Sequence, residues 1–261
     1  MNLWQSIEHA LDRLDRKALS KDIHVAASHK PSGRTHFLNA VCVFSIIHLS
    51  AFSAQAQAVD ACHLFRSEQK FVTQTLYMAM EDVRHVLTIP EIYFEDIGDR
   101  VNGTEHRAQL FRMMMDDFTP VTRQDTADLL RIGRKDYFTF VLRDPIDLDG
   151  ILPISASQMA TGDGRDMSAY KEMEFDFGLR SVLPISGAEI YREVYVARNE
   201  SGDLDAVFGC SNTPSFVNQG CNHDFRAHNI DVRMSYPREY LHDWQRLQSS
   251  VSDFISCALT Q

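Results

Sequence analysis

The hydrophobic positions show helical spacing before the midpoint of the chain and strand-like runs after it. In residues 60–87 apolar side chains lie three or four positions apart with charged residues between them, which predicts an amphipathic helix. The same spacing predicts a second helix over 104–118. Thr122 and Asp125 then have the spacing of a capping pair, so a third helix is expected to begin there.

After the midpoint, short runs rich in β-branched and aromatic residues alternate with Gly, Asp and Pro clusters. These runs predict the strands of an antiparallel meander, at 137–142, 151–154, 174–179, 189–197, 206–209 and 230–234. A last helix is predicted from Pro237 onward, with an apolar stripe made of Leu241, Trp244, Leu247, Val251, Phe254 and Ile255. We expect residues 59–261 to form a single α+β domain: N-terminal helices, then an antiparallel sheet meander, and a C-terminal helix packed on it.

One segment near the N-terminus has the features of an export signal. Residues 37–52 are almost wholly apolar, Lys30 and Arg34 precede them, and alternating small residues end at Ala58. Basic region, apolar region and small-residue site are the three parts of a secretory signal, so 37–58 is predicted to be cleaved near Ala58. The apolar run is short for a membrane span, and a buried core helix is the alternative.

Residues 1–36 lie in front of that segment. Their apolar residues between 3 and 19 have helical spacing. The stretch is either an N-terminal extension that lengthens the basic part of the signal or the result of a start codon assigned too far upstream, and we favour the second. In both cases residues 59–261 are expected to be periplasmic or secreted, with membrane contact only through the export signal.

The cysteine count fits an exported chain. Of the five cysteines, one lies in the predicted signal, which leaves an even number that can pair in three ways. We favour Cys210 with Cys221, which closes a local loop, and Cys62 with Cys257, which ties the first element of the domain to the last. Four free buried thiols and lipidation of Cys62 are the alternatives.

The formal net charge is −10. Binding to phosphate groups needs clustered Lys and Arg, so this charge argues against nucleic acids and anionic membrane surfaces as partners. It is compatible with solubility or with a basic protein partner. We expect another protein to be the partner, and no cofactor.

The densest group of chemically versatile residues is Cys210, Cys221, His223, Asp224 and His228. The two cysteines with His223 and His228 form an alternative metal set, although their spacing matches no closed zinc module and an oxidising compartment favours the disulfide. A second alternative is a hydrolase site assembled from His223, Asp224 and His228. The chain contains no G-x-S-x-G or H-E-x-x-H motif, so no catalytic residue is assigned.

Two stretches together carry a resemblance. One is 111–122; the other begins at Cys210 and includes 220–225, Tyr236 and Trp244. The chain resembles small exported proteobacterial proteins, and its C-terminal part is similar to periplasmic immunity proteins that guard against secreted antibacterial effectors. The resemblance implies an exported binding protein that occludes an effector, and transfers no catalytic residue. An envelope hydrolase or metal-binding enzyme is the alternative.

Overall fold

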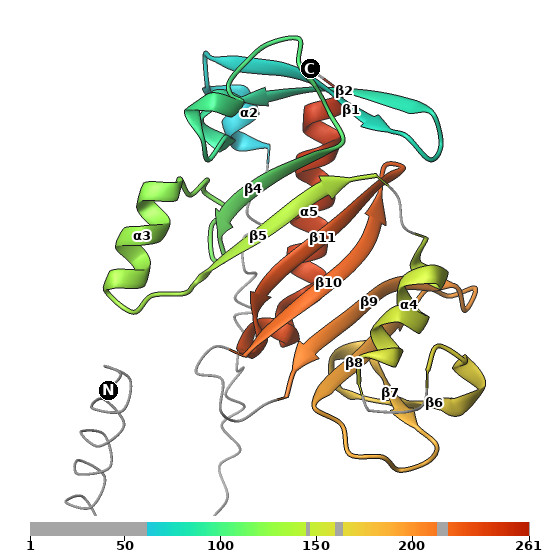
Figure 1. Ribbon diagram of the computed structural model, residues 1–261. Coiled ribbons are helices and arrows are strands. Elements are labelled where there is room, and N and C mark those ends of the chain that lie inside the picture. Colours follow the sequence, from blue (N-terminus) through green and yellow to red (C-terminus); the bar gives the residue numbers. More distant parts are fainter. Residues whose placement is uncertain (1–61, 145–146, 160–163, 213–218, 261) are drawn as a thin grey trace, which may run out of the picture. The chain divides into compact units, whose positions relative to one another are not determined.

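An antiparallel sheet of eight strands forms the centre of the computed structural model (Figure 1). The structure describes residues 62–144, 147–159, 164–212 and 219–260, all within one unit of the chain. The predicted extension and signal segment, 1–58, lie outside the described residues. Among the residues that are described, no helix is long and apolar enough to cross a membrane.

The first described elements form a small separate sheet. A short helix, α2 (His63–Ser67), leads into the antiparallel pair β1 (Phe71–Met78) and β2 (Val83–Pro90), and β3 (Glu105–His106) pairs parallel to β1. The helix predicted over 60–87 is therefore wrong beyond α2. Burial alternates strictly along β1, because successive side chains of a strand point to opposite faces. The β-branched and aromatic residues of this segment suit a strand better than a helix.

The helix predicted over 104–118 is also wrong. Strand β4 (Ala108–Met114) occupies its centre, and the buried residues Gln109, Phe111 and Met113 lie two positions apart. The third helix is confirmed as α3 (Arg123–Arg131). Its capping box is complete: the Thr122 hydroxyl accepts from the Asp125 amide at 3.2 Å, and the Asp125 carboxylate accepts from the Thr122 amide at 2.9 Å.

The main sheet confirms the predicted antiparallel architecture. Its strand order is β4-β5-β11-β10-β9-β8-β7-β6, so the last six strands of the chain form a meander whose final strand pairs with β5. The bounds of the remaining strands are β5 Tyr137–Arg143, β6 Tyr170–Glu174, β7 Arg180–Pro184, β8 Arg192–Arg198, β9 Leu204–Ser211, β10 Gly220–Ala227 and β11 Ile230–Pro237. The predicted runs at 137–142, 189–197, 206–209 and 230–234 fall mainly within these strands.

Two predicted strands have other structures. Residues 151–154 belong to a helix, α4 (Leu148–Ser157), which Asp147 caps through its side chain. A short apolar run suits a buried helix as well as a strand, and here Ile151 and Leu152 are buried on one helix face. Residues 174–179 straddle the end of β6 and a 3-10 turn. The 3-10 segments are η2 Glu91–Tyr93, η3 Ile97–Asp99, η4 Met167–Ala169, η5 Asp176–Gly178 and η6 Arg238–Asp243.

The C-terminal helix is confirmed as α5 (Trp244–Leu259), and it begins seven residues after Pro237 because η6 intervenes. It crosses one face of the sheet, behind the strands in Figure 1. The predicted stripe is buried along its whole length, and Phe254 contacts the rings of Phe111 and Phe140 at 5.2 and 5.4 Å. The stripe therefore forms the main core.

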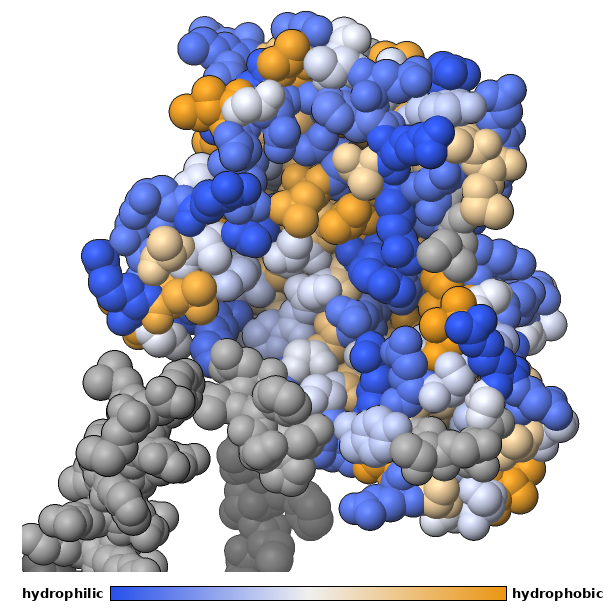
Figure 2. Space-filling view, viewed as in Figure 1, coloured by the Kyte–Doolittle hydropathy of each residue, from blue (hydrophilic) through white to orange (hydrophobic). Residues whose placement is uncertain are grey.

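The other face of the sheet is only half covered. Helix α4 packs there over β9 and its neighbours, on a second core of aliphatic residues that includes Val182, Val194 and Val207. Among the described residues, no helix covers β4, β5 or β11 on this side (Figure 1). Figure 2 shows this face mostly in hydrophilic and intermediate colours, with scattered hydrophobic residues. The open half of the sheet thus offers polar side chains to solvent.

Candidate functional site

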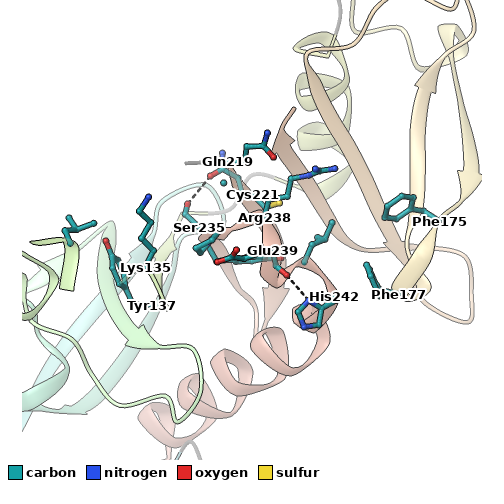
Figure 3. A pocket seen from close by; sticks show the side chains of 16 residues that line it. Lys135, Tyr137, Phe175, Phe177, Gln219, Cys221, Ser235, Arg238, Glu239 and His242 are labelled. Atoms are coloured by element: carbon teal, nitrogen blue, oxygen red, sulfur yellow. Dashed lines mark hydrogen bonds between the residues drawn. The ribbon is translucent and has the colours of Figure 1, made fainter. Parts of the chain in front are cut away.

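A groove of about 940 Å³ lies where β10 begins and β11 ends. One wall comes from the connection between α3 and β5, the other from the turn between β6 and β7, and η6 forms part of the floor (Figure 3). The lining residues on these walls and the floor include Leu130, Lys135, Tyr137, Phe175, Phe177, Asn222, Ser235, Arg238, Glu239 and His242. Elements far apart in the sequence therefore meet at one end of the sheet.

Two exposed phenylalanines form one wall of the groove. The side chains of Phe175 and Phe177 are 37% and 49% exposed, which is unusual for residues of this size. Phe177 has a φ of 64°, in the left-handed region that residues other than glycine rarely adopt. The indole nitrogen of Trp244 donates to the Phe177 carbonyl at 3.0 Å, and the Phe175 ring lies 4.5 Å from Tyr195. The core therefore holds this strained turn in place.

Polar groups line the rest of the groove. Arg238 forms an ion pair with Glu193, which also accepts from the Tyr195 hydroxyl at 2.7 Å. Burial, together with that hydrogen bond, raises the pKa of Tyr195 to about 12, so this hydroxyl stays protonated at neutral pH. The Ser235 hydroxyl donates to the Asn222 side chain at 2.9 Å, and His242 is bonded to the carbonyl of Glu239 at 2.8 Å. Ser235 and His242 are thus bonded to other groups and do not form a nucleophile and base pair.

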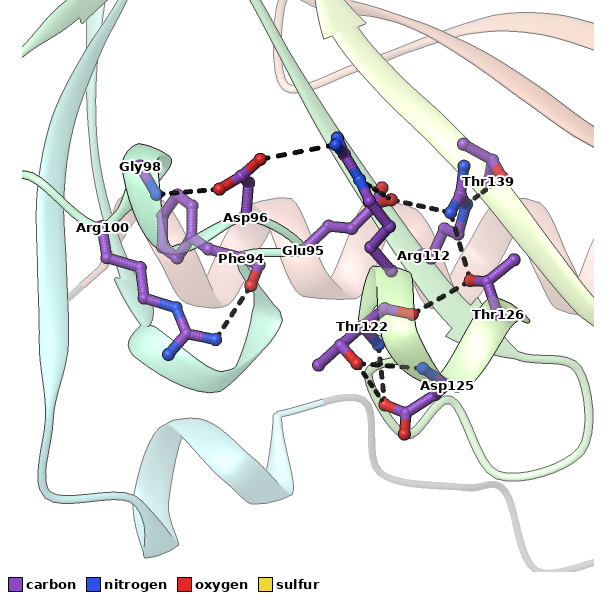
Figure 4. Close-up of polar contacts among 11 residues, drawn as sticks. Phe94, Glu95, Asp96, Gly98, Arg100, Arg112, Thr122, Asp125, Thr126 and Thr139 are labelled. Atoms are coloured by element: carbon purple, nitrogen blue, oxygen red, sulfur yellow. Dashed lines mark hydrogen bonds and ion pairs between the residues drawn. The ribbon is translucent and has the colours of Figure 1, made fainter. Parts of the chain in front are cut away.

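The wall that contains Lys135 is fixed by a buried carboxylate. Glu95, whose side chain is 6% exposed, pairs with Arg112 at 2.8 Å and with Arg123 at 3.3 Å. The same nitrogen of Arg112 donates to Thr126 at 3.1 Å, so β4 and α3 are held together (Figure 4). Lys135 follows α3 and reaches the groove from this anchored position.

The four cysteines of the predicted domain form two disulfides, in the pairs that the sequence analysis favours. Cys210 and Cys221 face each other across β9 and β10, with their Cα atoms 4.0 Å apart, and both are buried. Cys62 and Cys257, with Cα atoms 5.9 Å apart, join the start of α2 to the end of α5. Neither Cys210 nor Cys221 has a free thiolate for a metal ion.

The alternative metal set is not brought together. His223 lies inside the main core on β10, whereas His228 lies at the turn between β10 and β11 with a φ of 51°. Within the described residues, no three His, Cys, Asp or Glu side chains are placed to hold a metal ion. His223 does not lie in a loop, because β10 continues through it.

His223 is a neutral core residue. Its ring stacks on Phe208 at 4.1 Å, its Nε2 is bonded to the Gln248 side-chain oxygen at 2.9 Å, and its Nδ1 accepts from the Tyr236 hydroxyl at 3.4 Å. Burial lowers its pKa to about 3. Asp224 is the next residue along the strand and therefore points to the opposite face of the sheet. The hydrolase site proposed from His223, Asp224 and His228 is thus not assembled.

Sequence reasoning missed the residues that shape the groove. Phe175 and Phe177 fall in the run 174–179, for which the sequence predicts a strand, and the sequence analysis assigns no role to Lys135. The one signal was the Phe-Asp-Phe-Gly sequence at 175–178, which places two large apolar side chains beside turn-forming residues.

Comparison with known proteins identifies a related fold but no family. No family model matches the sequence, and no curated protein matches it. An immunity protein of the Stenotrophomonas maltophilia type IV secretion system has a similar structure, with a TM-score of 0.52 and 14% identity over 74% of this chain and 96% of that one. The iron-regulated outer membrane lipoprotein FrpD of Neisseria meningitidis is less similar, with a TM-score of 0.42 and 12% identity over 74% of this chain and 94% of FrpD. At these identities, the first likeness shows a shared fold.

Proposed function

We propose that this chain is an exported, immunity-type protein that binds a secreted antibacterial effector and occludes it. The observation that carries the proposal is the groove, in which Phe175 and Phe177 are held exposed by a strained turn tied to the core. Exposed aromatic residues on a rigid support are the usual anchors of protein interfaces. The shared fold with an immunity protein, over nearly the whole of that protein, supports the immunity class.

The strained backbone at Phe177 supports a role in binding. Non-glycine residues in sparsely populated conformations cost about 1–3 kcal/mol and persist where the surrounding structure enforces them, often at functional sites. A glycine at position 177 would remove the strain, and a polar residue would remove the exposed ring. The chain has neither, and Trp244 supplies a buried hydrogen bond that holds the turn.

We further propose that the protein works outside the cytoplasm as a single domain, 59–261, released by cleavage near Ala58. Two disulfides support this location, because disulfides persist in oxidising compartments and are rare in the cytosol. Occlusion of an effector in the periplasm would protect the producing cell without any catalytic step. The groove supplies aromatic and charged side chains suited to such binding, among them Phe175, Phe177 and Lys135.

The proposal is tested by protection from toxicity. Candidate effector genes beside this reading frame are expressed in the periplasm of a susceptible bacterium, with the wild-type protein, Phe177→Ala or Tyr191→Ala. Tyr191 is the matched control, because its side chain is 48% exposed and it does not line the groove. Wild type and Tyr191→Ala should protect, and Phe177→Ala should protect less.

Affinity measurement then locates the contact. Removal of an interface anchor typically costs 2 kcal/mol or more, so Phe177→Ala should weaken the Kd for the purified effector by about 30-fold. Circular dichroism melts establish that both variants are folded. Equal affinity of wild type and Phe177→Ala would show that the groove is not the contact, and protection by none of the proteins would refute the immunity role.

A further inference from the structure

A group of arginines on the face of the sheet that α4 partly covers has no role in the groove described above. Arg143 lies on β5, Arg233 on β11 and Arg192 on β8, and the Arg192 side chain extends over β9 to the Gly209 carbonyl. Arg233 and its partner Asp224 are adjacent in the register of β10 and β11. Each lies two residues from a groove-lining residue on its own strand: Arg233 from Ser235, and Asp224 from Asn222. That separation is about 7 Å.

Gly209 provides a seat for the guanidinium of Arg192. A Cβ atom at position 209 would lie 2.6 Å from Nη2 and 2.8 Å from Nε of Arg192, closer than a Cβ atom comes to another heavy atom in real proteins. The Arg192 guanidinium therefore lies flat across β9, where its Nη2 donates to the Gly209 carbonyl at 3.3 Å. Any larger residue at 209 would displace the guanidinium from this position. The close approach explains why a glycine is placed inside a strand.

Positive charge exceeds negative charge at the centre of this group. Asp224, whose side chain is 5% exposed, accepts two hydrogen bonds from Arg233 at 2.7 and 2.9 Å and one from Arg143 at 3.2 Å. Both of its oxygens accept these hydrogen bonds, yet the buried Nε atoms of Arg143 and Arg192 have no hydrogen-bond acceptor among the residues that the structure describes. Buried donors that lack acceptors are costly, so an acceptor brought by a ligand would be favoured.

The neighbouring charges do not neutralise the excess fully. Asp231 lies beside Arg143 but is also 3.7 Å from Arg226, which pairs with Glu81 at 2.6 Å. Burial, with the nearby Arg233 guanidinium as the next cause, lowers the pKa of both Arg143 and Arg192. A lowered arginine pKa means that its charged form is under-stabilised in this environment.

We propose that Arg143, Arg192 and Arg233 form a subsite that receives an acidic side chain of the protein partner. This inference rests on the proposed function. Planar guanidinium groups match the two oxygens of a carboxylate, and a partner seated in the groove would reach the subsite across two residues of β10 and β11. In a protein with a net charge of −10, one cationic subsite selects partners that place an acid at that point.

The substitution Gly209→Ala tests the subsite without changing charge. Its Cβ displaces the Arg192 guanidinium, which is the far end of a flexible side chain, and position 209 has no positive φ that alanine would resist. Gly98→Ala is the matched control, because its Cβ would meet only ordinary contact at 3.6 Å and it lies in η3, outside this face. Thermal melts establish that both variants fold.

The first measurement uses the chain alone with sodium acetate as the probe. The Nε–Hε signal of Arg192 in nitrogen-15 NMR spectra should shift and saturate with acetate in wild type and in Gly98→Ala, and should not shift in Gly209→Ala. An absent shift, or an equal shift in Gly209→Ala, overturns the subsite. Saturation by inorganic phosphate at lower concentration than by acetate would overturn the carboxylate assignment.

The second measurement uses the effector identified by the protection assay. Gly209→Ala and Arg192→Gln should each weaken its Kd at least tenfold, whereas Arg131→Gln, which removes an arginine whose side chain is 76% exposed on α3, should not. If Phe177→Ala weakens binding but Gly209→Ala does not, the subsite is refuted and the proposed function stands. If no variant weakens binding, both fail.

Discussion

Acidification should destabilise this protein through His223. The histidine is fully buried and its pKa is lowered to about 3, whereas in the unfolded chain it titrates near its ordinary value of 6.5. Below pH 6.5 the unfolded state therefore binds a proton that the folded state excludes, and stability falls as pH falls. One pH unit corresponds to about 1.4 kcal/mol, so the free energy of unfolding should drop by about 2.7 kcal/mol between pH 7.5 and pH 4.5 from this residue alone.

Urea unfolding at a series of pH values measures the effect, with His223→Gln as the reference. Carboxylates with lowered pKa values, such as Asp125, Asp136 and Glu172, lose their contribution at lower pH, mainly below pH 4.5. The difference between wild type and His223→Gln over pH 7.5–4.5 therefore isolates the histidine. The reasoning is refuted if the two proteins show parallel pH profiles, because His223 would then be protonated within the fold at little cost.

Two further predictions follow from the core and the disulfides. Trp244→Ala removes a buried residue that is 5% exposed and should lower the free energy of unfolding by about 3–5 kcal/mol. Trp244→Phe should lower it less, mainly by leaving the Phe177 carbonyl without its hydrogen bond. An unchanged melting temperature in Trp244→Ala would contradict the packing. Non-reducing mass mapping of periplasmic material should show an N-terminus near Val59 and the pairs Cys62–Cys257 and Cys210–Cys221, and Cys210→Ser should lower stability by about 2–4 kcal/mol. Four free thiols in that material would contradict the pairing.

The C-terminal helix and strand β5 were predictable because each has a pattern that one structure satisfies best. In α5 the buried positions repeat over sixteen residues, long enough to separate a period of 3.6 from a period of 2. The run at 137–142 is rich in aromatic and β-branched residues and was assigned correctly as β5. Length and composition agree in both elements, so local preference and tertiary packing favour the same answer.

The early strands were mistaken for helices because a spacing of four positions fits both structures. Val72 and Leu76 lie on one face of a helix, and they also lie on one face of a strand, where side chains alternate. Gln74 lies between them and is also buried, where its amide donates to the carbonyl of Asp99. A polar residue at a core position hid the alternation, and that hydrogen bond comes from tertiary structure that the sequence alone does not display.

The arginine subsite shows what pattern reasoning cannot reach. A glycine inside a strand indicates that something approaches the backbone closely, but not which group does so. At Gly209 the answer depends on register, which places it opposite Val194 and Asn222 and lets Arg192 extend over it. Because only glycine leaves room at position 209, the Arg192 guanidinium is held in one position over β9. Its Nε has no acceptor among the described residues, so a ligand that supplies an acceptor would be bound more favourably. Replacement of Gly209 therefore probes the subsite more directly than removal of any arginine. It keeps every charged group in the protein and displaces only the guanidinium of Arg192.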